Sequence, residues 1–81
     1  MIEASADIDE GVRVPDSSKI WHLAQVRSGA RIGEDCIIGR GAYIGAGVEV
    51  GDACKVQNYA LLYEPARLQG SVHRPGRSAD E

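Results

Sequence analysis

One stretch of sequence decides the fold: residues 32–51 read IGEDCIIGRGAYIGAGVEVG. An aliphatic residue followed by glycine recurs there every six residues, at Ile32, Ile38, Ile44 and Val50. A period of six fits neither an α-helix, with about 3.6 residues per turn, nor a coiled coil, with about 3.5. The stretch therefore predicts short strands joined by tight corners.

The same period extends outward from this stretch in both directions. Stepping by six from Ile2 to Leu68 gives twelve positions, and all twelve are Ile, Val or Leu. Because 18 of the 81 residues are of these types, twelve arbitrary positions would hold only about three. Four residues after each aliphatic position stands a small residue, so each hexad points one large and one small side chain to the same face. Glycine, which tolerates the positive φ of tight bends, closes four corners at Gly11, Gly29, Gly41 and Gly47.

Composition narrows the class of protein. The chain is 43% hydrophobic and 26% charged, which argues against disorder, and it has no apolar run long enough to span a membrane. Its net charge of −3 argues against a nucleic-acid-binding protein. The acidic start of the chain is unlike a secretory leader, so a cytoplasmic location is expected. Cys36 and Cys54 both occupy the small inward position and are expected to be buried, reduced thiols, with a redox pair as the alternative.

These repeats resemble the hexapeptide-repeat family. The resemblance implies an all-β fold, a left-handed parallel β-helix of triangular section, with about four coils of 18 residues over residues 1–69. Residues 70–81 depart from the pattern, because Arg74 stands where an aliphatic residue is expected. They are predicted to form an irregular tail, either disordered or produced by a frameshift just upstream of Val72.

Outward-facing residues that are 18 apart are expected to stack on one another. His22, Arg40 and Asn58 form one such ladder on an edge of the prism, and Trp21, Gly39 and Gln57 form the adjacent one. An imidazole, a guanidinium and an amide in line make a polar surface suited to a sugar or a phosphate.

Two short elements resemble a narrower group within that family. Residues 20–23 read IWHL and residues 56–59 read VQNY, which look like elements of N-acetyltransferases that modify nucleotide-linked amino sugars for bacterial surface polysaccharide. The resemblance implies that acetyl-CoA donates an acetyl group to the amino group of a nucleotide sugar. It also implies a homotrimer with sites between neighbouring prisms.

The resemblance suggests roles for individual residues. His22 is the candidate for acid–base catalysis, and Arg40, Gln57 and Asn58 are candidates for substrate binding. The alternative for these polar groups is a solvated surface or a hydrogen-bond network between subunits, and Trp21 is expected to pack at the trimer contact. No metal site is expected, because zinc would need three imidazoles and the repeat holds only His22, with His73 in the tail. The chain is expected to lack the later coils needed for full activity, and the alternative function is a non-catalytic oligomerisation module.

Overall fold

The computed structural model describes residues 1–64, 67–68 and 72–73, and these residues form strands and turns without a helix. Every described strand is two residues long. The strands are Asp7–Ile8 (β1), Lys19–Ile20 (β2), Gln25–Val26 (β3), Arg31–Ile32 (β4), Ile37–Ile38 (β5), Tyr43–Ile44 (β6), Glu49–Val50 (β7), Lys55–Val56 (β8), Leu61–Leu62 (β9), Arg67–Leu68 (β10) and Val72–His73 (β11).

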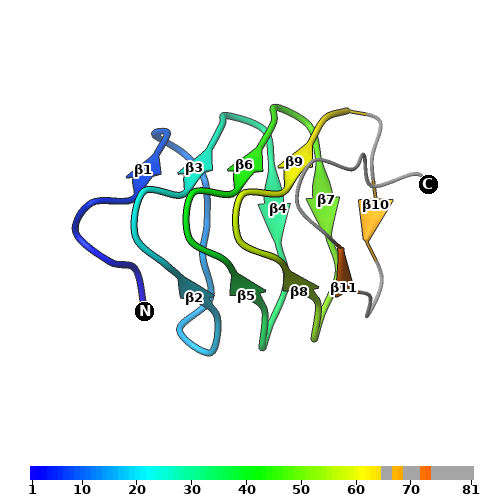
Figure 1. Cartoon of the computed structure of the whole chain (residues 1–81). Coiled ribbons are helices and arrows are strands. Elements are labelled where there is room, and N and C mark those ends of the chain that lie inside the picture. Colours follow the sequence, from blue (N-terminus) through cyan, green and yellow to red (C-terminus); the bar gives the residue numbers. More distant parts are fainter. Residues whose placement is uncertain (65–66, 69–71, 74–81) are drawn as a thin grey trace.

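Parallel pairing gathers the strands into three sheets that form the walls of a coil (Figure 1). Sheet 1 has the order β1-β3-β6-β9, sheet 2 the order β2-β5-β8-β11, and sheet 3 the order β4-β7-β10. Pairing joins residues that are 18 apart, as Gln25 pairs with Tyr43. The result is an all-β parallel β-solenoid of about three turns, consistent with a left-handed β-helix. The predicted fold class is confirmed.

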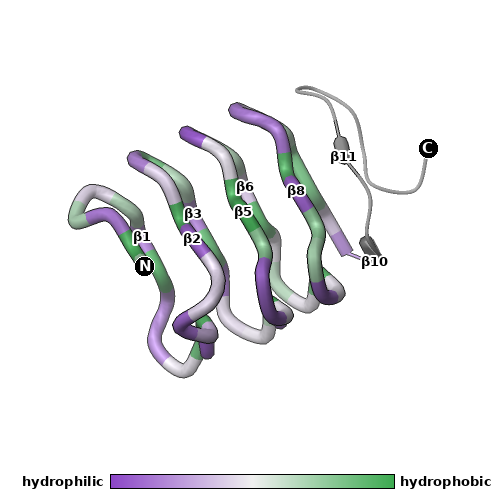
Figure 2. Tube along the Cα trace, turned by 90° about the horizontal axis from the view of Figure 1, so that it is seen from below, coloured by the Kyte–Doolittle hydropathy of each residue, from purple (hydrophilic) through white to green (hydrophobic). Residues whose placement is uncertain are grey.

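The two predicted rows of inward side chains form the core. Between Ser18 and Leu62, every large and every small inward position is buried, with at most 6% of the residue exposed. In Figure 2 the coils appear as successive rungs, and hydrophobic residues recur at the same place in each rung. The first coil is less well covered: Ile8 and Val14 are half-buried, and Ile2 is 45% exposed. Stacking therefore buries the aliphatic rows wherever a coil has a neighbour on both sides.

Left-handed backbone occurs at one position of the hexad. The four predicted corner glycines have φ between 66° and 87°. Four other residues at the same hexad position share this conformation: Leu23, Asp35, Ala53 and Tyr59. Ser5 and Ser17 hold the same hexad position without a positive φ, so most corners of the coil, but not all, require the left-handed region. This conformation costs about 1 kcal/mol for a residue with a Cβ.

Sheet 3 lacks its strand in the first coil, although Val14 keeps the hexad period. At the equivalent place in other coils, the residue after the strand donates its N–H to the next coil, as Gly33 does to the Val50 carbonyl at 2.8 Å. Pro15 occupies this place in the first coil and has no N–H to donate to Ile32. No backbone hydrogen bond joins residues 12–15 to β4 in the described structure. The proline thus accounts for the missing strand.

The predicted tail lies largely outside the described residues. Strand β11 falls within it, and Val72 pairs with Lys55 at a separation of 17 rather than 18. Residues 69–71 and 74–81 are not described, so the boundary at residue 69 and the origin of the tail stay predictions.

Candidate functional site

His22 lies on the corner between β2 and β3, with half of its side chain exposed. Its Nδ1 is 3.2 Å from the Ser5 hydroxyl, and its Nε2 is 3.6 Å from the Glu3 carboxylate. The Ser5 oxygen also accepts a hydrogen bond from the Leu23 N–H at 3.1 Å, and its hydroxyl can either donate to Nδ1 or accept from it. The Glu3 carboxylate beside Nε2 favours a proton on Nε2, in which case Ser5 donates to Nδ1. The imidazole is therefore oriented from both sides.

Sequence reasoning missed Ser5 and Glu3. The stacking rule places Ala4 beneath His22, and Ser5 and Glu3 flank that residue in the first coil. The sequence did contain a signal for these two residues. The separation of 18 residues predicted the ladder toward later coils, and it applies equally toward the N-terminus. A histidine side chain is long enough to reach the neighbours of the residue on which it stacks.

Arg40 lies one coil above His22, as the ladder predicts. The Gly41 N–H donates to the His22 carbonyl at 2.9 Å, and the Tyr59 N–H donates to the Arg40 carbonyl at 2.8 Å. The Arg40 guanidinium donates from Nε to the Tyr59 hydroxyl at 3.2 Å. The described structure gives no side-chain contact between His22 and Arg40. The two share an edge, and the arginine is directed toward the later coil.

Asn58 closes the ladder through its side chain. Its Oδ1 accepts the Arg40 N–H at 2.9 Å. Asp52 does the same on another edge, where its Oδ1 accepts the Glu34 N–H at 2.8 Å. The asparagine therefore serves as a corner acceptor, and its amide NH₂ is the part left for other contacts. Gln57 is half-buried beside it, and its backbone carbonyl accepts the Ala60 N–H at 3.2 Å.

Gly39 is required next to this corner. A Cβ on Gly39 would lie 2.6 Å from both the backbone nitrogen and the Oδ1 of Asn58. The glycine in the predicted ladder of Trp21, Gly39 and Gln57 thus lets two coils approach closely.

The profile of a known family, bacterial transferase hexapeptide (six repeats), matches residues 11–46 and residues 29–64. Together these matches cover about two thirds of the chain. The chain belongs to this hexapeptide transferase family. A search of the curated proteins gives no match.

In this hexapeptide transferase, Trp21 stands on the outer face of sheet 2. Its residue is 37% exposed, and the Lys19 ammonium lies 5.5 Å from the centroid of its ring. Such a separation allows a cation–π interaction. Ile37 is exposed to the same extent on the neighbouring strand of the same sheet. An indole and an aliphatic side chain thus share one exposed surface.

Both cysteines are free thiols in the core, as predicted. The Cys36 thiol donates to the Gly51 carbonyl at 3.0 Å. Burial raises the pKa of the Cys36 thiol, because a thiolate would lose its hydration there. Since the thiolate is the reactive form of cysteine, this thiol is suited to filling space rather than to redox chemistry.

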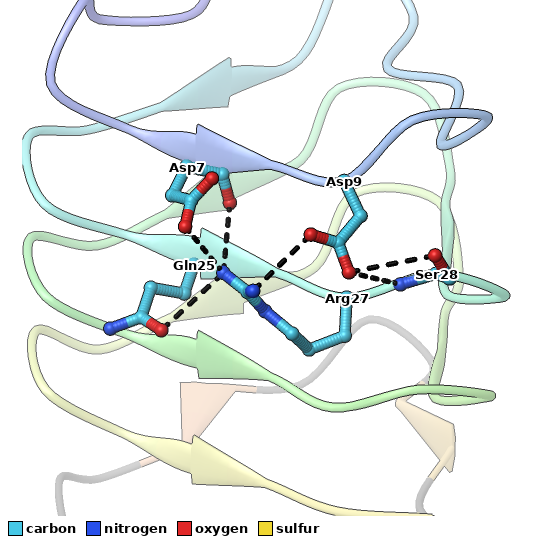
Figure 3. Close-up of polar contacts among 5 residues, drawn as sticks. All are labelled: Asp7, Asp9, Gln25, Arg27 and Ser28. Carbon is cyan, nitrogen blue, oxygen red and sulfur yellow. Dashed lines mark hydrogen bonds and ion pairs between the residues drawn. The ribbon is translucent and has the colours of Figure 1, made fainter.

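A cluster around Arg27, which sequence analysis did not single out, joins the first coil to the second (Figure 3). Its guanidinium pairs with Asp7 at 3.0 Å and with Asp9 at 3.2 Å. The hydrogen bond that the guanidinium donates to Asp7 and the charge of Asp9 raise the pKa of Arg27, although burial acts in the opposite direction. Asp9 also accepts the Ser28 N–H at 2.9 Å. Both terminal nitrogens of this guanidinium pair with carboxylates of the first coil, whereas its buried Nε has no hydrogen-bond partner among the described residues. The cluster therefore links two coils within the protein.

The described residues contain neither a candidate metal site nor a candidate membrane span. They hold no group of three or more His, Cys, Asp and Glu side chains that could bind a metal ion. Among them, no helix is long and apolar enough to span a membrane.

Proposed function

We propose that this chain is an acetyltransferase that moves an acetyl group from acetyl-CoA to the amino group of a nucleotide-linked amino sugar. The observation that carries the proposal is the His22 imidazole, held between Ser5 and Glu3 on a chain of the hexapeptide transferase family. A half-exposed imidazole held between a hydroxyl and a carboxylate suits proton transfer to and from a substrate.

The chemistry requires that a neutral amine lose a proton as it attacks. Acetyl-CoA carries the acetyl group as a thioester. As the amine attacks, a C–N bond to the acetyl carbon forms and the C–S bond breaks. The Ser5 hydroxyl passes its proton to Nδ1 of His22 and takes the proton of the attacking amine. Glu3 then stabilises the imidazolium that forms. The leaving thiolate receives this proton from His22 and the relay returns to its starting state.

Other residues fit the binding of the two substrates. Arg40 and the amide NH₂ of Asn58 lie along the same edge as His22 and suit the oxygens of a sugar or a phosphate. Lys19 and Lys55 are exposed on sheet 2 and suit the phosphates of the coenzyme. Trp21 and Ile37 on that sheet suit a contact between subunits of a homotrimer in the cytoplasm.

An acetyl-transfer assay with UDP- and dTDP-linked amino sugars tests this proposal. Release of coenzyme A thiol is the readout, and turnover is expected with at least one sugar. His22→Ala should lower kcat/KM by about a hundredfold or more. Glu3→Gln should lower kcat and shift the pH profile, whereas Glu10→Gln, the matched control in the same coil, should change neither. The rate of turnover also tests the prediction that this chain lacks later coils needed for full activity.

A non-catalytic oligomerisation module is the second candidate. It is favoured by the exposed Trp21 and Ile37 surface and by two grooves that are lined by residues of the first coil and sheet 3 rather than by His22. No turnover, together with no thermal shift on adding acetyl-CoA and a trimeric mass in solution, would support this candidate and contradict the first.

A further inference from the structure

The interruption at Pro15 leaves one edge of β4 exposed. Elsewhere the aliphatic residue of the strand bonds to the previous coil through both of its backbone groups: the Ile20 N–H donates to the Met1 carbonyl, and the Ile20 carbonyl accepts from Glu3. The equivalent groups of Ile32 would bond to Arg13 and Pro15, and neither bond is present in the described structure. Ile32 thus presents an N–H and a carbonyl toward the first coil, a strand edge open to pairing.

A groove opens along this edge. It has a volume of about 490 Å³ and is bordered by Arg13 and Pro15 on one side and by Ala30, Arg31 and Ile32 on the other. Ala30 and Ile32 are each 6% exposed, whereas no other buried hydrophobic residue in the described part of the core exceeds 2%. The wall of the solenoid is therefore open to a ligand at this place.

A second groove, of about 730 Å³, continues the first toward the end of β4. It shares Arg13, Pro15 and Ile32 with the first groove, which makes the two continuous. Because it reaches Gly33 and Glu34, whereas the first reaches back to Gly29 and Ala30, the combined groove follows the whole of β4.

Opposite charges mark the two ends of the combined groove. Arg31 borders only the part of the groove where β4 begins, and Arg13 borders both parts. Neither guanidinium forms an ion pair or a hydrogen bond within the described residues, in contrast to Arg27 and Arg40. The end where β4 finishes is bordered by three carboxylates, those of Asp16, Glu34 and Asp52.

Part of that acidic end is already engaged. The Glu34 carboxylate accepts the Ser17 hydroxyl at 2.6 Å, and the Asp52 carboxylate accepts the Glu34 N–H at 2.8 Å. Each of these carboxylates can accept further hydrogen bonds.

We propose that this groove binds a short, extended peptide with free termini, about three residues long. Its carboxylate lies between Arg13 and Arg31, and its amino group lies at Asp16, Glu34 and Asp52. The ligand then runs antiparallel to β4 and pairs with the N–H and carbonyl of Ile32. An extended tripeptide spans about 10 Å, a length that covers the two residues of β4 and reaches the corner that follows it.

Titration of the full chain with trialanine, with calorimetry and backbone amide NMR shifts as the two readouts, tests this inference. Saturable binding is expected, with the largest shifts at Ile32 and Gly33. N-acetyl-trialanine amide lacks both charges and should bind about tenfold more weakly or worse. Absence of saturable binding, or equal binding of the capped peptide, would overturn the proposal.

Variants of the groove provide the matched comparison. Arg13→Gln and Arg31→Gln should each weaken trialanine binding about tenfold, whereas Arg40→Gln, at an exposed arginine away from the groove, should leave it unchanged. Pro15→Ala restores the missing donor and should close the groove, so that binding is lost while the circular dichroism spectrum is kept. Equal loss in Arg40→Gln, or full binding by Pro15→Ala with the strand pairing restored, would contradict the assignment.

Discussion

Sheet 1 and sheet 3 are built from the same hexad, yet one is continuous and the other is interrupted in the first coil. In sheet 1, Asp9 follows β1 and donates its N–H to the Val26 carbonyl at 2.9 Å. Pro15 holds the corresponding position in sheet 3, and pairing stops there. The hydrophobic period is intact in both, so the period places side chains but does not by itself make a strand. A backbone donor at one position decides whether two coils join.

The consequences of this difference extend to packing and to binding. Where the coils join, inward residues such as Val26 are fully buried. Where they do not, Ala30 and Ile32 of the second coil keep a slight exposure, whereas Val14 is half-buried like Ile8, because both belong to the end coil. The closed walls therefore supply stability, and the open wall supplies a concave surface with an unpaired strand edge.

The largest expected effect comes from truncating the same side chain in a closed and an open part of the molecule. Val26→Ala removes two buried methyl groups from the core and should lower the free energy of unfolding by about 2 kcal/mol. Val14→Ala removes them from a half-buried site and should cost less than about 1 kcal/mol. Urea unfolding of both variants measures the difference, and equal losses would show that the two regions are packed alike.

Two glycines allow the second comparison. Gly39→Ala places a methyl group against the backbone of Asn58 in sheet 2 and should destabilise by about 2 kcal/mol. Gly11→Ala meets no atom within 4 Å and carries only the strain of its positive φ, about 1 kcal/mol. The two melting temperatures give the order directly, and a larger loss in Gly11→Ala would contradict the account of the corner.

The third comparison uses the pH dependence of stability, and its expected effect is smaller. Because the folded state raises the pKa of Cys36, the unfolded chain loses this proton at a lower pH than the folded chain. The stability that this thiol contributes is complete below the unfolded pKa and declines as pH rises above it, from about pH 8.5. Between pH 8 and pH 10, the melting temperature of the wild type should therefore fall by more than that of Cys36→Ala. An identical fall in melting temperature for both proteins would show that the Cys36 thiol is not shielded from water.

The sequence predicted the fold well because one inward face recurs at every hexad from Ser18 to Leu62. It also predicted that His22, Arg40 and Asn58 share an edge, and hydrogen bonds between their coils join them. The roles of these residues, and that of Gln57, stay predictions, because a shared edge does not show what binds there.

Two of the features that were not predicted have different physical reasons. The partners of His22 lie in the preceding coil, where the stacking rule had not been applied. The open wall depends on one missing N–H rather than on a side-chain pattern, and a hydrophobic period does not report backbone donors. Pro15 was visible in the sequence, but its consequence required knowing which residue of the hexad donates to the next coil.

Amide hydrogen exchange at Ile32, compared with Ile44, tests the central claim most directly. Both residues hold the same place in the hexad, but Ile44 lies in a strand paired on both sides and Ile32 faces the interrupted coil. The Ile32 amide should exchange at least about tenfold faster than the Ile44 amide in the wild type, and Pro15→Ala should remove most of that difference. Equal protection of the two amides in the wild type would contradict the claim that a proline opens this wall.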